Sequence, residues 1–301
     1  MLLGARFEST NGSSGGTPPD GELPSGDRPV QVDRSASVTR RSSIETRFLV
    51  ESETLLIDLE KRLKILSSAS CHGGLVRARY IMNHQVPANP VAAPSAPSGR
   101  KWTDPAKYLK QVAGGLGVVG EAVALMTAVP MKQLVTLREE ADGVWVEGFV
   151  TVGVTNAVRA GDPVKPAAAD RHAKPGTINI ILVTNARLAD SAMVGAVQVL
   201  TESKAAVLLA AGVPSWSGRR GATGTGTDAV VIACGAGRSG PQLRYSGTHT
   251  KIGELIGRLV MRGVNEGLKR SERWLKRRLA QGDRQAAMKR AFPLAAQDKS
   301  L

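Results

Sequence analysis

The sequence is short of several residue types, and each shortage excludes a class of protein. Only two cysteines occur in 301 residues, Cys71 and Cys234, so neither a disulfide framework nor the Cys/His spacing of a zinc site is present. Aromatic residues make up 4%, which leaves few side chains to stack on nucleic-acid bases. No run of 18 apolar residues occurs, and residues 1–14 lack the apolar segment of a signal peptide. We therefore expect a soluble, cytoplasmic protein with no membrane partner.

Acidic residues are also in deficit, and the resulting positive charge is unevenly placed. Forty Lys and Arg face 26 Asp and Glu, a formal net charge of +14. Ten basic and three acidic residues lie between Lys269 and Lys299, so half of the excess belongs to that segment. The middle of the chain is near balance, which argues against a nucleic-acid partner. An RNA-binding protein working through the basic C-terminal run stays an alternative, and salt-dependent binding lost on deleting 269–301 would support it.

Composition divides the chain into three parts. Residues 1–44 are rich in Gly, Ser, Pro, Asp and Arg with almost no large apolar side chains, which predicts a disordered extension. Residues 45–268 carry the apolar periodicity of one folded domain. Residues 269–301 are predicted to be a basic tail, helical at first and then disordered. The hydrophobic content of 42% is enough for a core in the middle part.

The start of the domain is predicted to be an antiparallel meander followed by a helix. Three apolar runs, 47–51, 54–58 and 62–66, have the spacing of short strands. Residues 75–86 have helical spacing, and the Gly-Gly pair before them would open that helix with N–H groups able to bind an anion.

Strands and helices alternate in the rest of the domain. Strands are predicted over 122–129, 144–154, 176–186 and 229–234. Helices are predicted over 102–114 (with Asp104 as N-cap and Pro105 first), 130–140, 191–211 and 250–268. Because the first three strands are consecutive, we predict an α+β fold. It is a single domain with a mixed, partly antiparallel sheet, in one or two sub-sheets, and packed helices.

The predicted helix 191–211 is nearly all Ala, Val and Leu. Asp190 is predicted to cap its start. Glu202 and Lys204 are charges in its middle, and we interpret them as its exposed stripe, with a functional role as the alternative.

Glycine and threonine gather in one stretch, 221–254. Gly and Thr alternate before Asp228, which enters the short strand 229–234, and Gly-Thr-His-Thr-Lys precedes a helix at 247–251. Such residues let the backbone approach a ligand and line a pocket with hydroxyl and N–H groups, although tight turns are the plain alternative. The tetrapeptide Val-Thr-Asn-Ala occurs at 154–157 and 183–186, each time after an apolar strand. We expect both copies to deliver Thr and Asn to one edge of the sheet.

Six segments together resemble the adenosylcobinamide amidohydrolases, in the same order and from about Thr46 to Val264. They are Leu66-Ser-Ser-Ala with Gly73-Gly74 and Asn83-His-Gln-Val86, Leu125-Met-Thr-Ala128, Val152-Gly-Val-Thr-Asn-Ala157, Gly176-Thr-Ile-Asn-Ile180, Thr223-Gly-Thr-Gly-Thr-Asp228, and Gly247-Thr-His-Thr-Lys251 with Gly253-Glu254. The resemblance implies hydrolysis of the amide between the corrin ring and aminopropanol of adenosylcobinamide. The product, adenosylcobyric acid, re-enters coenzyme B12 synthesis. The corrinoid is then the substrate, with no separate cofactor, and the resemblance assigns no catalytic residue.

Amide hydrolysis needs a nucleophile, donors for the oxyanion and an acid for the leaving amine. We predict His249 as base or acid, with Asp228 or Glu254 to orient it, so that His249 and Asp228 act in one site. The nucleophile is a water or the hydroxyl of Thr225, Thr227 or Thr248. The predicted substrate-binding residues are Asn83, Asn156, Asn185, Thr225, Thr227 and Thr248.

Other readings of these residues stay open. No Ser lies in a Gly-x-Ser-x-Gly elbow, which disfavours a serine hydrolase. No metal is expected, although Asp228, His249 and Glu254 could form a carboxylate–histidine site. The second function class is a non-catalytic corrinoid- or phosphate-binding module, but no Gly-Lys-Ser/Thr follows Gly-Thr-Gly-Thr as in an NTPase loop. Asp228 could also simply cap a turn, and the oligomeric state stays open.

Overall fold

The computed structural model describes the domain and the first part of the tail. The described residues are 45–86, 104–163, 176–218, 221–236 and 240–291, with side chains up to residue 280. The predicted disordered extension, 1–44, and the last ten residues of the tail lie outside them.

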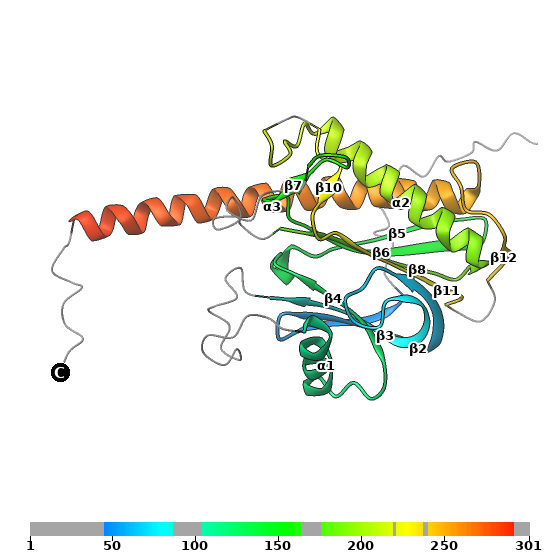
Figure 1. Cartoon of the computed structure of the whole chain (residues 1–301). Coiled ribbons are helices and arrows are strands. Elements are labelled where there is room, and N and C mark those ends of the chain that lie inside the picture. The colour runs from blue at the N-terminus through cyan, green and yellow to red at the C-terminus, as the bar shows by residue number, and fades with distance from the viewer. Residues whose placement is uncertain (1–44, 87–103, 164–175, 219–220, 237–239, 292–301) are drawn as a thin grey trace, which may run out of the picture. The chain divides into compact units, whose positions relative to one another are not determined.

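One sheet of eight strands forms the centre of the domain (Figure 1). Its order is β4-β3-β2-β11-β8-β6-β5, and β1 pairs with β2. The strands are β1 (Arg47–Glu51), β2 (Thr54–Ser67), β3 (Gly74–Gln85), β4 (Ala122–Thr127), β5 (Val135–Ala141), β6 (Val144–Val152), β8 (Ile178–Thr184) and β11 (Ala229–Cys234). Two small pairs of strands lie outside this sheet. β7 (Ala157–Val158) pairs antiparallel with β10 (Gly224–Thr225), and β9 (Arg187–Leu188) pairs parallel with β12 (Gln242–Leu243).

The sheet bends over itself and three layers of apolar side chains hold the domain together. Ile81 of β3, Phe149 of β6 and Ile181 of β8 meet in one buried cluster, so the β1–β4 half faces the β5, β6, β8 and β11 half. The outer face of the first half packs on α1 (Pro105–Gly115). The outer face of the second half packs on α2 (Asp190–Ala210) and α3 (Lys251–Ala291). Figure 1 shows α1 below the bent sheet and the other two helices above it. The predicted α+β class with a mixed sheet is confirmed.

Several predicted elements are confirmed. The strands predicted at 122–129, 144–154, 176–186 and 229–234 are β4, β6, β8 and β11. The Asp104 carboxylate caps α1 by accepting from the N–H groups of Ala106 at 3.0 Å and Lys107 at 3.1 Å. The helix predicted at 250–268 is α3, which continues into the basic tail as far as Ala291.

Strand β3 (Gly74–Gln85) occupies nearly all of residues 75–86, so the predicted helix there was wrong. β3 pairs with β2 on one side and β4 on the other, and its side chains enter both the inter-sheet cluster and the α1 cluster. Residues 81–84 are buried in succession, and a stretch of strand covered on both faces loses the alternation of apolar and polar residues and can match a helical spacing by chance. The Gly-Gly pair therefore opens a strand and offers no helix N-terminus.

Two other predictions at the start of the domain were wrong in detail. The runs 54–58 and 62–66 are one strand, β2, with a β-bulge between Asp58 and Leu63 where Glu60 has a φ of 63°. The helix predicted over 130–140 is only one 3₁₀ turn, Met131–Gln133, followed by β5. The β-branched residues at the start of β5 pair with β6. This strand pairing outweighs the preference for a helix that Pro130 indicates.

Helix α2 is a core helix with one unexpected charge. It is long and apolar enough to cross a membrane by length and composition, but Ala196, Leu200 and Leu208 are buried against the sheet and α3. Ala189, and not Asp190, is its N-cap, and the Asp190 carboxylate instead pairs with Lys64 at 2.6 Å. Asp190 is the first residue of the helix, where a carboxylate is also favoured by the helix dipole.

Candidate active site

The sheet has two ends, and the polar residues divide between them. β8 and β11 run parallel, and β6 is antiparallel to both, so the start of β8 and β11 and the close of β6 meet at one end. We call this the Thr225 end, because β10 with Thr225 lies beside it. The other end, where Asn185 follows β8, is the Asn185 end. About 20 Å separates the two ends of β8, given its seven residues.

Asp228 organises the Gly/Thr loop at the Thr225 end. One carboxylate oxygen, Oδ1, accepts from the Ile178 N–H at 3.0 Å and from the Thr225 hydroxyl at 2.5 Å. The other, Oδ2, accepts from the Thr225 N–H at 3.0 Å and from Lys204 Nζ at 2.5 Å. These four bonds join β8, β10 and α2 around one carboxylate, so Asp228 does more than close a turn.

Lys204 is buried, so its assignment to an exposed stripe was wrong. Its side chain is 9% exposed and that of Asp228 is 13% exposed. A buried ammonium needs a charged or hydrogen-bonded partner, and Asp228 provides it. Glu202, two residues earlier on α2, is exposed as predicted. Gly224 also fits here only because it has no Cβ, which would contact Asp228 and Lys204.

A row of buried amides crosses between the two sheet halves at the same end. Asn179 donates through Nδ2 to Asn83 Oδ1 at 2.9 Å and to the Met126 carbonyl at 2.8 Å. Asn83 in turn donates to the Thr151 hydroxyl at 3.3 Å. Asn83, Thr151 and Asn179 are each at most 2% exposed. Satisfied polar networks in such a place fix the relative position of the strands that carry them.

His84, next to Asn83, faces the other way and has structural partners. Its ring nitrogens lie 2.8 Å from the Thr54 hydroxyl and 2.9 Å from the Tyr108 hydroxyl of α1. Burial lowers the pKa of His84, so the ring is neutral at pH 7. It joins α1 to the sheet and presents no acid or base to the Thr225 end.

Asn156 carries a buried acceptor without a donor. No hydrogen-bond partner of its Oδ1 is found among the described residues. Gly176 lies against it, since a Cβ there would be 2.9 Å from Oδ1 and 2.6 Å from the Thr155 hydroxyl oxygen. Thr227, which is exposed, donates to the Gly176 carbonyl at 3.3 Å. An unsatisfied buried acceptor is costly unless a water or ligand supplies a donor, which makes the surroundings of Asn156 a candidate binding surface.

Asn185 lies at the opposite end, so the two Val-Thr-Asn-Ala copies do not share an edge. Its Oδ1 accepts from the Trp145 N–H at 2.9 Å and its Nδ2 donates to the Gly143 carbonyl at 2.8 Å. Asn185 therefore holds the β5–β6 hairpin. The two copies separate because they follow β6 and β8, which are antiparallel.

His249 and Asp228 are not in one site, contrary to our prediction. His249 and Thr248 are exposed just before α3, where the Ser246 hydroxyl donates to the Ala192 carbonyl in the first turn of α2 at 2.5 Å. Asp228 is bonded to Lys204, twelve residues further along α2, which is about 18 Å of helix.

Glu254 does not orient His249 through any described contact. Its carboxylate pairs with Lys251 at 2.7 Å and with Arg258, and the Lys251 ammonium lowers the pKa of Glu254. In the described part of the chain, no three His, Cys, Asp or Glu side chains are grouped as a metal site. The site that the fold assembles is thus made of hydroxyls, amides and one Lys–Asp pair.

The Thr225 end contains five of the predicted site residues and three others: Thr151, Asn179 and Lys204, for which a functional role was only the alternative. Asn83, Asn156, Thr225, Thr227 and Asp228 are there, while Asn185, Thr248, His249 and Glu254 are at the other end. The additions are Lys204, Thr151 and Asn179. The sequence held a signal for two of them. Asn179 is the single Asn inside the apolar run at 178–183, and Lys204 is the single Lys in the second half of an apolar helix.

Comparison with known proteins places this α+β domain among amide hydrolases. Residues 35–276 match the model of the adenosylcobinamide amidohydrolase family, so the chain belongs to that family. An adenosylcobinamide amidohydrolase of Methanosarcina mazei is 32% identical over 233 residues, 74% of this chain and 97% of that protein. An uncharacterized protein of Methanocaldococcus jannaschii is 34% identical over 234 residues, 72% of this chain and 86% of the relative.

Two solved structures show more distant similarity. They are the PH0078 protein of Pyrococcus horikoshii, with a TM-score of 0.37 over 72% of this chain and 77% of that chain, and a beta-aminopeptidase of a Burkholderia species, with a TM-score of 0.35 over 75% and 79%. Both are 11% identical in sequence, and neither bears on function at this level of similarity.

Proposed function

We propose that the protein hydrolyses the amide between the corrin ring and aminopropanol of adenosylcobinamide. Water adds across the C–N bond and the products are adenosylcobyric acid and aminopropanol. The observation that carries the proposal is the family match, which spans residues 35–276 and so includes the whole described sheet. The reaction needs no cofactor, since water is the second reactant, and we place it in the cytoplasm.

The composition of the Thr225 end supports an amide-rich substrate. Corrinoids carry carboxamide side chains, which both donate and accept hydrogen bonds. Asn156 offers an acceptor to which none of the described residues donates, and Thr227 offers an exposed hydroxyl near it. Amide and hydroxyl groups of this kind pair with carboxamides without requiring a charge.

The same end holds the groups to which we assign the chemistry. The Thr225 hydroxyl is the nucleophile in this proposal, and its proton passes to Asp228 along their 2.5 Å hydrogen bond. Lys204 keeps Asp228 in place through the 2.5 Å ion pair. The proton then goes to the departing aminopropanol nitrogen, and water releases the corrinoid carboxylate from Thr225. The predicted role of His249 as an acid or base has no part in this scheme, and mutation of His249 tests it.

The first test measures product formation by two threonine variants. We expect the wild-type protein, incubated with adenosylcobinamide, to yield adenosylcobyric acid and aminopropanol by mass spectrometry. Thr225→Val keeps the shape but removes the hydroxyl, so turnover should fall by a factor of about 100 or more, the usual size for a catalytic group. Thr225→Ser should retain a substantial part of the activity.

The matched control is Thr248→Val, an exposed threonine at the other end of the sheet. Its turnover should stay near that of the wild type. Full activity in folded Thr225→Val would remove Thr225 as nucleophile and leave a bound water. Corrinoid binding by the wild type with no cobyric acid formed would favour the second function class, a non-catalytic corrinoid-binding module.

A further inference from the structure

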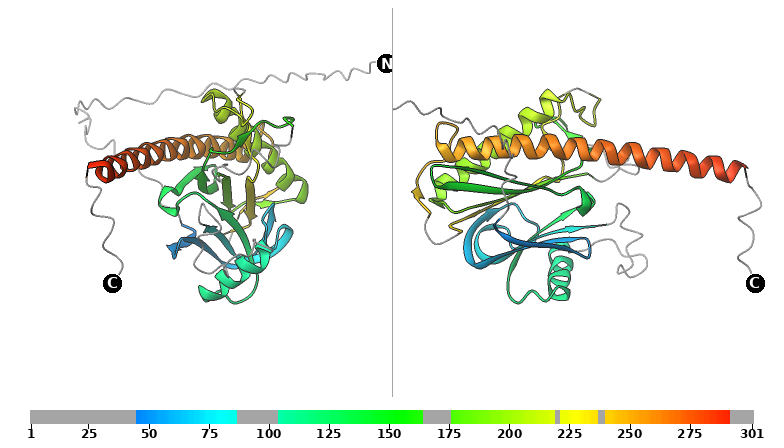
Figure 2. Two further views of the ribbon diagram at one scale, coloured as in Figure 1. Left: turned by 60° about the vertical axis from the view of Figure 1, so that its left-hand side comes forward. Right: turned by 180° about the vertical axis from the view of Figure 1, so that it is seen from behind.

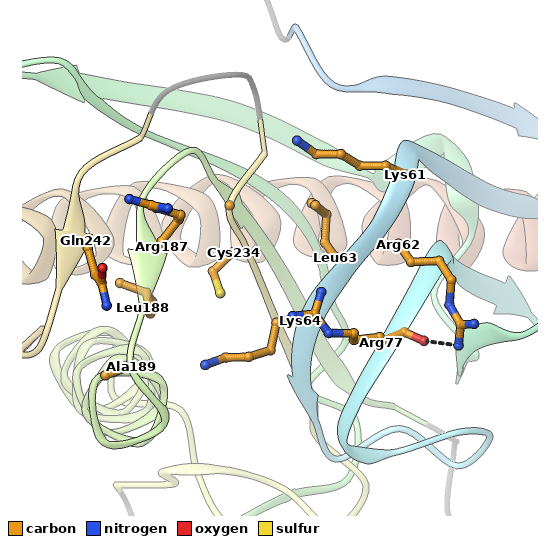
Figure 3. A pocket seen from close by; sticks show the side chains of 11 residues that line it. Lys61, Arg62, Leu63, Lys64, Arg77, Arg187, Leu188, Ala189, Cys234 and Gln242 are labelled. Atoms are coloured by element: carbon orange, nitrogen blue, oxygen red, sulfur yellow. Dashed lines mark hydrogen bonds between the residues drawn. The ribbon is translucent and has the colours of Figure 1, made fainter.

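A positively charged pocket of about 490 Å³ lies at the Asn185 end, between the bend of β2 and the β9–β12 pair. Figure 3 shows Arg187 and Gln242 on one side, Lys64 and Arg77 on the other, and Cys234 between them. Five of the residues that line it are basic: Lys61, Arg62, Lys64, Arg77 and Arg187. Its position is at the end of β11 remote from Asp228, so the pocket is distinct from the candidate active site.

The basic charge of this pocket is only partly compensated. None of the described residues that line it is acidic. Carboxylates from outside the lining reach at least two of these described side chains: Asp190 pairs with Lys64 at 2.6 Å, and Glu121 lies 3.5 Å from Arg62. Arg77 and Arg187 are exposed and stand on opposite sides of the opening. A concave surface lined by charge of one sign concentrates ligands of the opposite sign.

The floor of the pocket is apolar. Leu63, Leu188 and Cys234 are buried beneath the basic side chains. Burial raises the pKa of the Cys234 thiol, which therefore stays neutral at pH 7 and adds no negative charge. The volume lies in the range of small-molecule sites, which combine an apolar lining with a few placed polar groups.

We propose that this pocket binds a phosphorylated small molecule, and specifically a nucleoside di- or triphosphate. The phosphates would lie between Arg77, Arg187 and Lys64, since guanidinium groups bind phosphate oxygens in pairs. The uncharged base and sugar would cover the apolar floor. This ligand is an effector or second ligand, because adenosylcobinamide hydrolysis at the Thr225 end consumes no phosphate compound.

Titration calorimetry on the full-length protein tests the proposal with three probes: ATP, pyrophosphate and adenosine. We expect ATP to bind more tightly than either fragment, with an affinity that falls steeply as salt rises. In the double variant Arg77→Gln/Arg187→Gln, the Kd for ATP should rise at least tenfold. The control double variant Lys107→Gln/Lys110→Gln removes two charges from exposed positions of α1 and should bind ATP as the wild type does.

Each other outcome has a defined meaning. Equal affinity for ATP and pyrophosphate supports a phosphate site and overturns the nucleoside part. ATP binding that is absent, or equally strong in the pocket variant, overturns the proposal. The assay contains no corrinoid, so its failure is separate from failure of the proposed hydrolysis. The pocket variant should still hydrolyse adenosylcobinamide, since neither arginine belongs to the Thr225 end.

Discussion

At the residue scale, the most informative side chain is Asp228. Its four hydrogen bonds place the Thr225 hydroxyl and the Lys204 ammonium on the same carboxylate. The sequence indicated Asp228 as a site residue through the Gly/Thr repeat before it. It could not indicate Lys204 as its partner, because that contact joins α2 to β11 and depends on how the helix lies on the sheet.

The position of His249 leads to the second prediction, which concerns coupling. Asp228→Asn should lower turnover by a factor of about 100, because the carboxylate no longer takes the Thr225 proton. Whatever His249→Ala alone costs, the double variant should lose the product of the two factors to within about twofold, as distant sites do. Steady-state turnover of the three variants measures this. A double variant no slower than Asp228→Asn, when His249→Ala alone is strongly impaired, would mean that the two residues act as one unit.

At the element scale, α3 depends on glycines where it crosses β6. A Cβ at Gly148 would contact the Leu259 side chain, and a Cβ at Gly267 would contact Val152. Gly263 lies against Val150 with slightly more room, at a Cβ distance of 3.0 Å. Because these positions have no side chains, the helix can approach the strand closely. Figure 2 shows from behind how α3 runs along the sheet.

The third prediction follows from this close packing. Gly148→Ala should destabilise the fold by about 1–3 kcal/mol, as overpacking of a core does, because Leu259 is fully buried and has little room to move. The matched control is Gly114→Ala on α1, where no atom lies within 4 Å of the added Cβ. That substitution should be neutral or stabilise by up to about 1 kcal/mol. Urea unfolding of both variants measures the difference, and equal stabilities would contradict the packing argument.

Helices and strands could be told apart in the sequence where one face of the element is exposed to solvent or where its first residues form a cap. The Asp104-Pro105 start fixed α1, and the apolar stripe of Ile252, Leu255 and Leu259 fixed α3. β3 was mistaken for a helix because residues 81–84 in its second half are buried on both faces. For the site, the sequence indicated which residue types take part, but it did not indicate which of those residues lie together. Whether Asn156 and Asn185 share an edge depends on strand direction, which no local pattern in the sequence encodes.

At the scale of the whole molecule, the described core is contained within a limited stretch of chain. Its buried apolar side chains run from Leu55 to Val264. Three polar contacts lie just outside this stretch. The N–H groups of Glu45 and Thr46 donate to Glu147 at 2.7 and 3.0 Å, and Arg270 donates to the Leu134 carbonyl at 2.5 Å. A boundary after residue 268 would therefore remove Arg270 and its contact with the domain.

The last prediction separates these boundaries. A chain of residues 41–280 keeps every side chain that the structure describes as buried, together with these polar contacts, so its Tm and its turnover of adenosylcobinamide should match those of the full chain. A chain that ends at residue 262 loses Val264, which is fully buried, together with the contact of Gly267 with Val152. Burial of one valine side chain alone contributes about 1.5–3 kcal/mol, so this chain should melt several degrees lower or fail to fold. A 41–280 chain with a lowered Tm would mean that a terminal segment belongs to the folded domain. A lowered turnover at unchanged Tm would instead mean that a terminal segment takes part in binding the corrinoid.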